Sequence, residues 1–264
     1  MKISIASYSF HGLSGEGKMN VFGYLETCKH RYGLDTADLW NGTVGSTDES
    51  FLRKVRQTLD ENEMTLVNYH ADGPCVWEDD PAAREKNYKL ALEHLRAAEI
   101  LGAKTVRIDT GSKKVVPMNQ EQCDYVVKRY REYAKRGADA GFRVGPETHW
   151  GFSLLIDNME KIAKGVDSPA YGVLLHIGHW EQIDPEEADR RIARWACHTH
   201  VDAKITRTCL EPRLKMLLDA GYQGYWVVEH HSAKNEYFEV ACQLAEVRRV
   251  VNRLNNPEPA AAKA

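Results

Sequence analysis

The sequence lacks any apolar stretch long enough to cross a membrane. No run reaches the roughly 18 apolar residues that a transmembrane helix needs. The N-terminal segment MKISIASYSF also lacks the long apolar core of a signal peptide and is predicted to form a first strand. Six cysteines are scattered without a Cys-x-x-Cys pair. This pattern is more typical of reduced thiols than of disulfides, so a cytoplasmic protein without a membrane partner is expected.

The chain also lacks a strong charge of either sign. Lys and Arg number 35 and Asp and Glu number 38, which gives a formal net charge of −3. Nucleic-acid binding usually requires a basic surface, so neither a nucleic-acid partner nor a nuclease activity is favoured. The length of 264 residues is compatible with one large α/β barrel or with two ordinary domains.

Strand-like and helix-like segments alternate along the whole sequence. The predicted strands cover residues 3–7, 34–40, 64–70, 105–109, 142–147, 171–178, 195–201 and 224–230, and the predicted helices cover 21–32, 50–62, 80–101, 120–140, 154–164, 185–193, 209–220 and 236–252. Such alternation implies parallel strands with helical crossovers. Eight pairs without an internal linker predict a single (β/α)₈ TIM barrel over residues 1–255, followed by a flexible C-terminal tail, 256–264. A doubly wound sheet is the alternative, but the GLSGEG segment lacks the Gly-x-Gly-x-x-Gly spacing that would favour it.

Four residues close or directly follow the last four predicted strands. They are Glu147 in VGPETHWG, His176 in VLLHIGHW, His200 in HTHVDAK and Glu229 in WVVEHH. They are 29, 24 and 29 residues apart, about the length of one strand–helix unit. In a barrel, successive parallel strands would bring the four side chains to the same end. Two carboxylates and two imidazoles in one cleft predict a divalent-metal site.

Other polar residues near the predicted strand ends are candidates for substrate binding. They are His179, Lys204, His70, Asp109 and Trp40. For His179 and Lys204 the alternative is a solvated side chain, and for His70 and Asp109 it is a position behind the metal ligands. Trp40 could form a wall on which a sugar stacks, or it could simply pack in the core.

Three further histidine positions leave alternatives open. His149 lies two residues after Glu147 and is a candidate base, because imidazole exchanges protons near neutral pH. His198 shares a strand face with His200, so it is either an additional ligand or a residue of the barrel interior one layer lower. His230 and His231 are adjacent, so at most one of them faces inward.

The motifs ETHWG, LLHIGHW and VEHHS resemble the sugar phosphate isomerase/epimerase superfamily, the xylose isomerase-like TIM barrels. In its ketose 3-epimerase branch, Glu ends strand five, Asp ends strand six with His three residues later, His ends strand seven and Glu ends strand eight. The resemblance implies that these positions are Glu147, His176 with His179, His200 and Glu229. It also implies a single-barrel fold and a small carbohydrate substrate.

One position departs from the epimerase pattern. His176 stands where the epimerases carry Asp, so the formal charge of the four ligands falls from −3 to −2. The added nitrogen favours Mn, Fe, Co or Zn over Mg or Ca, and Mn is the expected ion. In multi-metal endonuclease relatives the positions of His70 and Asp109 also bind metal, but Asp109 replaces the expected His.

The resemblance implies a metal-dependent enzyme that removes a proton from the carbon next to a sugar carbonyl. Glu147, Glu229 and His149 are the candidate catalytic residues. Epimerisation or isomerisation is the expected outcome. The alternative is elimination of a β leaving group from a 3-keto-glycoside or an inosose, by a lyase or dehydratase, and a non-catalytic sugar-binding barrel is a third possibility. A homo-oligomer is also expected.

Overall fold

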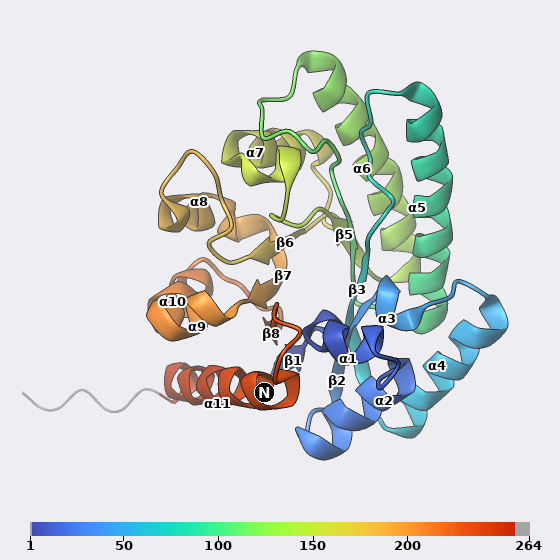
Figure 1. Cartoon of the computed structure of the whole chain (residues 1–264). Helices are drawn as coiled ribbons and strands as arrows, with labels where there is room; N and C mark the ends of the chain where they lie inside the picture. The colour runs from blue at the N-terminus through green and yellow to red at the C-terminus, as the bar shows by residue number, and fades with distance from the viewer. Residues whose placement is uncertain (1, 257–264) are drawn as a thin grey trace, which may run out of the picture.

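A computed structural model describes residues 2–256, which form alternating strands and helices (Figure 1). The strands are β1 (Ile3–Ile5), β2 (Thr36–Trp40), β3 (Thr65–Ala71), β4 (Thr105–Ile108), β5 (Arg143–Gly145), β6 (Val173–His176), β7 (Ala196–Val201) and β8 (Trp226–Val228). Each lies within, or extends by one residue beyond, a segment predicted as a strand. Of the predicted tail, residues 257–264 lie outside the described part of the chain.

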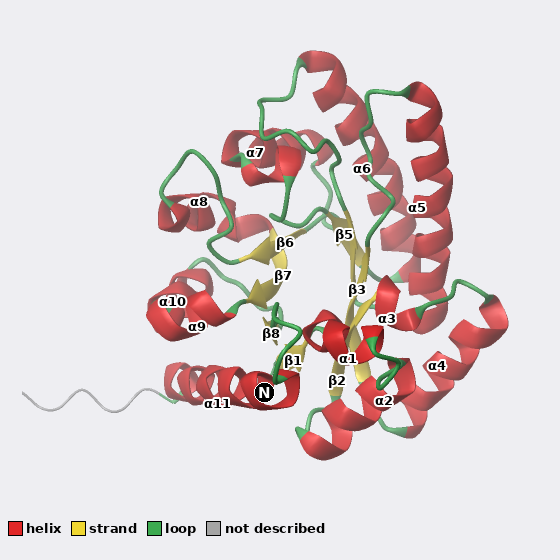
Figure 2. Ribbon diagram, in the orientation of Figure 1, coloured by secondary structure: helices red, strands yellow, loops and turns green. Residues whose placement is uncertain are grey.

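The strands close into a barrel. They form two parallel sheets with the orders β1-β8-β7-β6 and β2-β3-β4-β5. Isolated parallel bridges connect these sheets at two seams, Ala6 with Asp38 between β1 and β2, and Glu147 with Leu174 between β5 and β6. Figure 2 shows the strands at the centre and the helices around them. The predicted single (β/α)₈ barrel is confirmed.

Helices alternate with the strands along the chain. They are α1 (His11–Gly15), α2 (Val21–Glu26), α3 (Asn41–Val44), α4 (Glu49–Glu61), α5 (Pro81–Leu101), α6 (Gln120–Ala140), α7 (Ile156–Val166), α8 (Pro185–Ile192), α9 (Ala203–Thr208), α10 (Leu210–Asp219) and α11 (Glu236–Asn255). In α4, Leu52, Val55 and Leu59 recur at helical spacing and form its buried face. None of the helices in residues 2–256 is long and apolar enough to cross a membrane.

Local sequence signals explain where several helices begin and end. The side chains of Asp48 and Asp80 accept hydrogen bonds from backbone N–H groups in the first turns of α4 and α5. Gly141 ends α6 with a φ of +81°, a conformation that glycine adopts without strain. The predicted helix at 21–32 is divided, because α2 passes into a π-helical turn at Thr27–Arg31.

The barrel interior is polar near the carboxyl ends of several strands. TIM barrels usually fill this space with branched apolar side chains. Here β2 contributes Asp38, β3 contributes Asn68 and His70, and β7 contributes His198 and His200, all of them buried. Burying polar groups costs free energy unless they are paired, so this end of the barrel is where a functional site is expected.

Candidate metal centre

The structure brings together the four residues that the strand spacing singled out. His176 is the last residue of β6, His200 lies near the end of β7, and Glu229 directly follows β8. Glu147 lies two residues beyond β5, on the chain segment that bridges to β6. The four side chains are buried, and one potential ligand atom from each lies within 4.8 Å of the others.

The two imidazoles present the same nitrogen to the two carboxylates. His176 Nδ1 lies 3.1 Å from Glu147 Oε1 and 3.4 Å from Glu229 Oε2. His200 Nδ1 lies 3.0 Å and 3.4 Å from the same two oxygens. Two nitrogens and two carboxylate oxygens therefore converge on one point in a buried environment. This donor set fits a divalent cation, whose charge would balance the two carboxylates.

The electrostatics of the group agree with this interpretation. Burial raises the pKa of Glu147 and of Glu229, but the surrounding imidazoles outweigh it and hold both pKa values well below the ordinary range. Burial lowers the pKa of His176 to about 4. For His200, burial also lowers the pKa, but Glu229 and Glu147 outweigh this and raise it well above the ordinary value. A cation that binds here therefore competes with the proton on His200.

Asp38 lies on the inner side of His200. Its Oδ2 is 2.6 Å from His198 Nε2 and 3.4 Å from His200 Nε2, and its Oδ1 is 3.3 Å from His70 Nε2. His198 thus lies one layer below the four-residue group, hydrogen-bonded to Asp38. Asp38 was missed from the sequence, although a carboxylate within the predicted buried strand LDTADLW was a usable signal.

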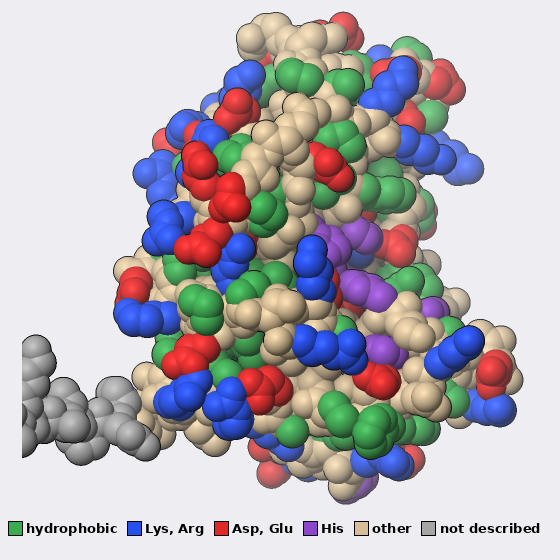
Figure 3. Space-filling view, turned by 60° about the vertical axis from the view of Figure 1, so that its left-hand side comes forward, with side chains coloured by type: hydrophobic (Ala, Val, Ile, Leu, Met, Phe, Trp, Pro, Cys, Tyr) green, Lys and Arg blue, Asp and Glu red, His purple; other side chains and the backbone are tan. Residues whose placement is uncertain are grey.

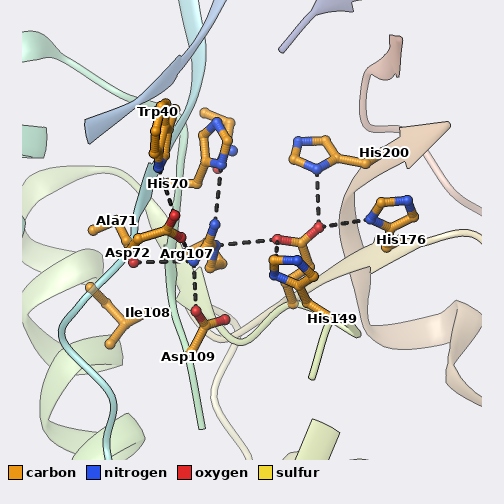
Figure 4. A network of polar contacts seen from close by, with 12 residues as sticks. Trp40, His70, Ala71, Asp72, Arg107, Ile108, Asp109, His149, His176 and His200 are labelled. Atoms are coloured by element: carbon orange, nitrogen blue, oxygen red, sulfur yellow. Dashed lines mark hydrogen bonds and ion pairs between the residues drawn. The ribbon is translucent and has the colours of Figure 1, made fainter. Parts of the chain in front are cut away.

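Arg107 connects the group to the opposite side of the barrel (Figure 4). This β4 residue is 2% exposed, and its Nη1 lies 2.6 Å from Asp109 Oδ2 and 2.7 Å from Asp72 Oδ1. Its Nε lies 3.2 Å from Glu147 Oε2 as an ion pair, without the alignment of a hydrogen bond. Arg107 was also missed, although an arginine in the strand-like segment TVRID, on the same face as Asp109, indicated a polar interior.

Three more histidines surround the centre. The ring of His179 stacks on that of His176, with centroids 3.6 Å apart, and its Nε2 lies 3.4 Å from Asp202 Oδ2. His149 Nδ1 lies 3.7 Å from Glu147 Oε2. His231 Nε2 lies 3.1 Å from Glu229 Oε2. Figure 3 shows histidine side chains gathered on this face, with Lys and Arg side chains beside them.

The two adjacent histidines after β8 point in different directions. His231 contacts Glu229, while His230 lies 3.2 Å from the Gln243 amide of α11. The prediction that at most one of them faces inward is confirmed.

The remaining predicted residues occupy different parts of the barrel mouth. His70 Nδ1 lies 3.2 Å from Arg107, so His70 and Asp109 both belong to the arginine network. Trp40 donates its indole N–H to Asp72 Oδ2 at 2.8 Å. Lys204 is exposed on α9 and lines a cavity of about 510 Å³ together with His231. A larger cavity of about 700 Å³, lined by Lys2, Lys104 and Arg143, lies at the opposite end of the barrel.

A family model described as xylose isomerase-like TIM barrel matches residues 29–254. The chain belongs to this family. No curated protein is significantly similar to it in sequence. The site lies at the carboxyl ends of the strands of this xylose isomerase-like barrel, where TIM barrels carry their reactive groups.

Solved structures similar to this xylose isomerase-like barrel include two epimerases and a dehydratase. The 3-keto-D-glucoside 4-epimerase YcjR of E. coli has a TM-score of 0.75 at 16% identity, over 94% of this chain and 99% of its own. The D-psicose 3-epimerase of Clostridium cellulolyticum H10, solved with D-tagatose, has a TM-score of 0.72 at 15% identity, over 96% and 97%. The probable 3-DHS dehydratase AsbF of Bacillus anthracis has a TM-score of 0.69 at 15% identity, over 98% and 100%. At these identities, the likeness establishes the shared fold alone.

Proposed function

We propose that this protein is a divalent-metal-dependent enzyme that acts on a sugar or keto-sugar as an isomerase or epimerase. The observation that carries the proposal is the buried convergence of Glu147, His176, His200 and Glu229 at the mouth of the barrel. Membership of the xylose isomerase-like family and the fold shared with two sugar epimerases support it.

The four convergent residues would hold the cation. Their two imidazole nitrogens favour Mn²⁺, with Zn²⁺, Co²⁺ or Fe²⁺ as other suitable ions. A bound divalent cation supplies Lewis-acid polarisation of a carbonyl oxygen, which makes the neighbouring C–H more acidic. Because Glu229 and Glu147 raise the pKa of His200, binding of a cation would be coupled to release of a proton from this imidazole.

Three residues are the candidates for moving the substrate proton. Glu147 and Glu229 come from opposite sides of the β6–β7 pair, so they approach a bound sugar from different directions. The side chain of His149 is 42% exposed and borders Glu147. One of these groups takes a proton from the carbon next to the carbonyl, and return of a proton to its other face gives the epimer.

Elimination is the second candidate reaction. The same proton abstraction leads to loss of a β leaving group if the substrate carries one, which makes the enzyme a lyase or dehydratase. The fold shared with the probable dehydratase of B. anthracis supports elimination as the alternative reaction. The open cavity beside His231 has room for a substituent on such a substrate.

Solvent-deuterium exchange tests the proposal directly. The protein with added Mn²⁺ is incubated in D₂O with ketoses and with 3-keto-glycosides, and deuterium at the carbon next to the carbonyl is measured by NMR. We expect exchange into at least one substrate, loss of exchange with a chelator, and loss of exchange in Glu229→Gln. Absence of exchange into every substrate tested would refute the proposed proton abstraction, and a fully active Glu229→Gln would refute the role of Glu229.

A further inference from the structure

Arg107 is surrounded by acceptors on every side of its guanidinium group. Nη1 contacts Asp72, Asp109 and the Ala71 carbonyl at 2.7, 2.6 and 3.1 Å. Nη2 lies 3.2 Å from His70 Nδ1, and Nε faces Glu147 Oε2. Both terminal nitrogens of Arg107 have polar partners, its Nε forms an ion pair with Glu147, and its side chain is only 3% exposed, so Arg107 is not positioned to bind a substrate directly.

The two carboxylate oxygens of Glu147 contact different neighbours. Oε1 lies 3.1 and 3.0 Å from the Nδ1 atoms of His176 and His200. Oε2 faces Arg107 at 3.2 Å, with His149 farther away at 3.7 Å. Figure 4 shows Arg107 on one side of the network and His176 and His200 on the other. Oε1 is therefore the oxygen that is turned toward the candidate metal position.

Glu229 has no comparable arrangement. Within residues 2–256 its ion-pair partners are His176, His200 and His231, without an arginine or lysine. Its Oε2 faces all three imidazoles, and His231 is 44% exposed. The two carboxylates of the candidate centre thus differ: Glu147 pairs with a buried permanent cation, while Glu229 pairs with a partly exposed histidine.

We infer that Arg107 is a positioning residue that holds Glu147 with Oε1 toward the metal and withdraws Oε2 from it. This inference rests on the proposed function, because it assumes that Glu147 is a ligand. Hydrogen bonds to Asp72 and Asp109 fix the guanidinium group, so it presents its charge to Glu147 Oε2 at one position, whereas a lysine supplies a more mobile charge. Asp72 and Asp109 directly follow β3 and β4 and hold the guanidinium group in place by accepting hydrogen bonds from Nη1.

The test compares Arg107→Lys with the wild-type protein. Lysine keeps the positive charge, so a change in metal affinity reports the loss of positioning and not a change in electrostatic repulsion. Mn²⁺ affinity is measured by calorimetry, and the electron paramagnetic resonance spectrum of bound Mn²⁺ reports the symmetry of its ligands. We expect about tenfold weaker binding, as is typical when a group that orients a ligand is removed, together with a changed spectrum.

Arg53→Lys is the matched control. Arg53 is exposed on α4 and pairs there with Glu49, so we expect the same Mn²⁺ affinity and spectrum as in the wild-type protein. If Arg107→Lys does not fold, Arg107→Gln serves as the second variant, and the spectrum is then the deciding measurement. If the folded Arg107 variant binds Mn²⁺ with unchanged affinity and an unchanged spectrum, this inference is overturned but the proposed function is not. A wild-type protein that binds none of Mn²⁺, Zn²⁺, Co²⁺ or Fe²⁺ would overturn the proposed function together with it.

Discussion

Asp38 offers a sharp test of how the barrel interior supports the candidate centre. The carboxylate is fully buried between His70, His198 and His200. Burial raises the pKa of Asp38, but the nearby imidazoles outweigh it and hold the pKa below its usual range, so the group is a permanent anion at neutral pH. Asp38→Asn removes this charge while preserving the shape of the side chain.

The expected effect on metal binding has a defined direction and size. Asp38 accepts from the Nε2 side of His200, which fixes the ring so that Nδ1 faces Glu147. Loss of such an outer contact typically weakens metal binding 10- to 100-fold, which corresponds to roughly 1.4–2.7 kcal/mol. Loss of a negative charge near the cation acts in the same direction. We therefore expect at least about tenfold weaker Mn²⁺ binding by Asp38→Asn.

Calorimetric titration with MnCl₂ measures this change, and circular dichroism establishes that the variant is folded. Asp35→Asn is a suitable control, because Asp35 lies just before β2, is exposed and pairs with Lys29 at the surface. The control should bind Mn²⁺ like the wild-type protein. If folded Asp38→Asn also binds Mn²⁺ with wild-type affinity, the inner carboxylate does not orient His200.

Two further predictions concern stability. Burial lowers the pKa of His94 to about 4, below its value of about 6.5 in the unfolded chain. The neutral imidazole therefore contributes fully to stability above pH 6.5, and the free energy of unfolding should fall by about 3 kcal/mol as the pH is lowered toward 4. His94→Gln retains an acceptor for the Tyr69 hydroxyl but cannot titrate. In urea unfolding, the variant should therefore lose less unfolding free energy between pH 7 and pH 4 than the wild-type protein does. An equal loss in both proteins would exclude His94 as the source of the pH dependence. Gly151 has a φ of +57°, and a Cβ there would lie 1.8 Å from the Ser112 carbonyl oxygen, so Gly151→Ala should cost about 2–4 kcal/mol in unfolding free energy. Gly33→Ala, with a φ of +59° and no atom within 4 Å of the added Cβ, should cost only about 1 kcal/mol, and equal losses would refute the steric argument.

Strand spacing was sufficient to predict the fold and the four convergent residues. Parallel strands of a barrel all end at one side, so Glu147, His176, His200 and Glu229 could be brought together without any knowledge of the side-chain contacts. The metal-binding role of these residues stays a prediction, as does the consequence of His176 in place of Asp.

The roles of Arg107 and Asp38 could not be derived from the strand spacing. Arg107 and Asp38 lie within strands and not at their ends, and their roles depend on which side chains face them across the barrel. Contacts such as that between Asp38 and His198, 160 residues apart, depend on the radius and register of the closed barrel. Strand order alone does not specify these quantities.

The seam between β5 and β6 has a consequence for the motions of the barrel. Glu147 lies on one side of this seam and His176 on the other. The two sides are joined by the Thr148 hydroxyl, which accepts from the His176 N–H and donates to the His176 carbonyl. A cation shared by Glu147 and His176 would tie the two edges together. Transient opening of the barrel and release of the ion then become a single event, and the amide of His176 should exchange with solvent more slowly when the ion is bound.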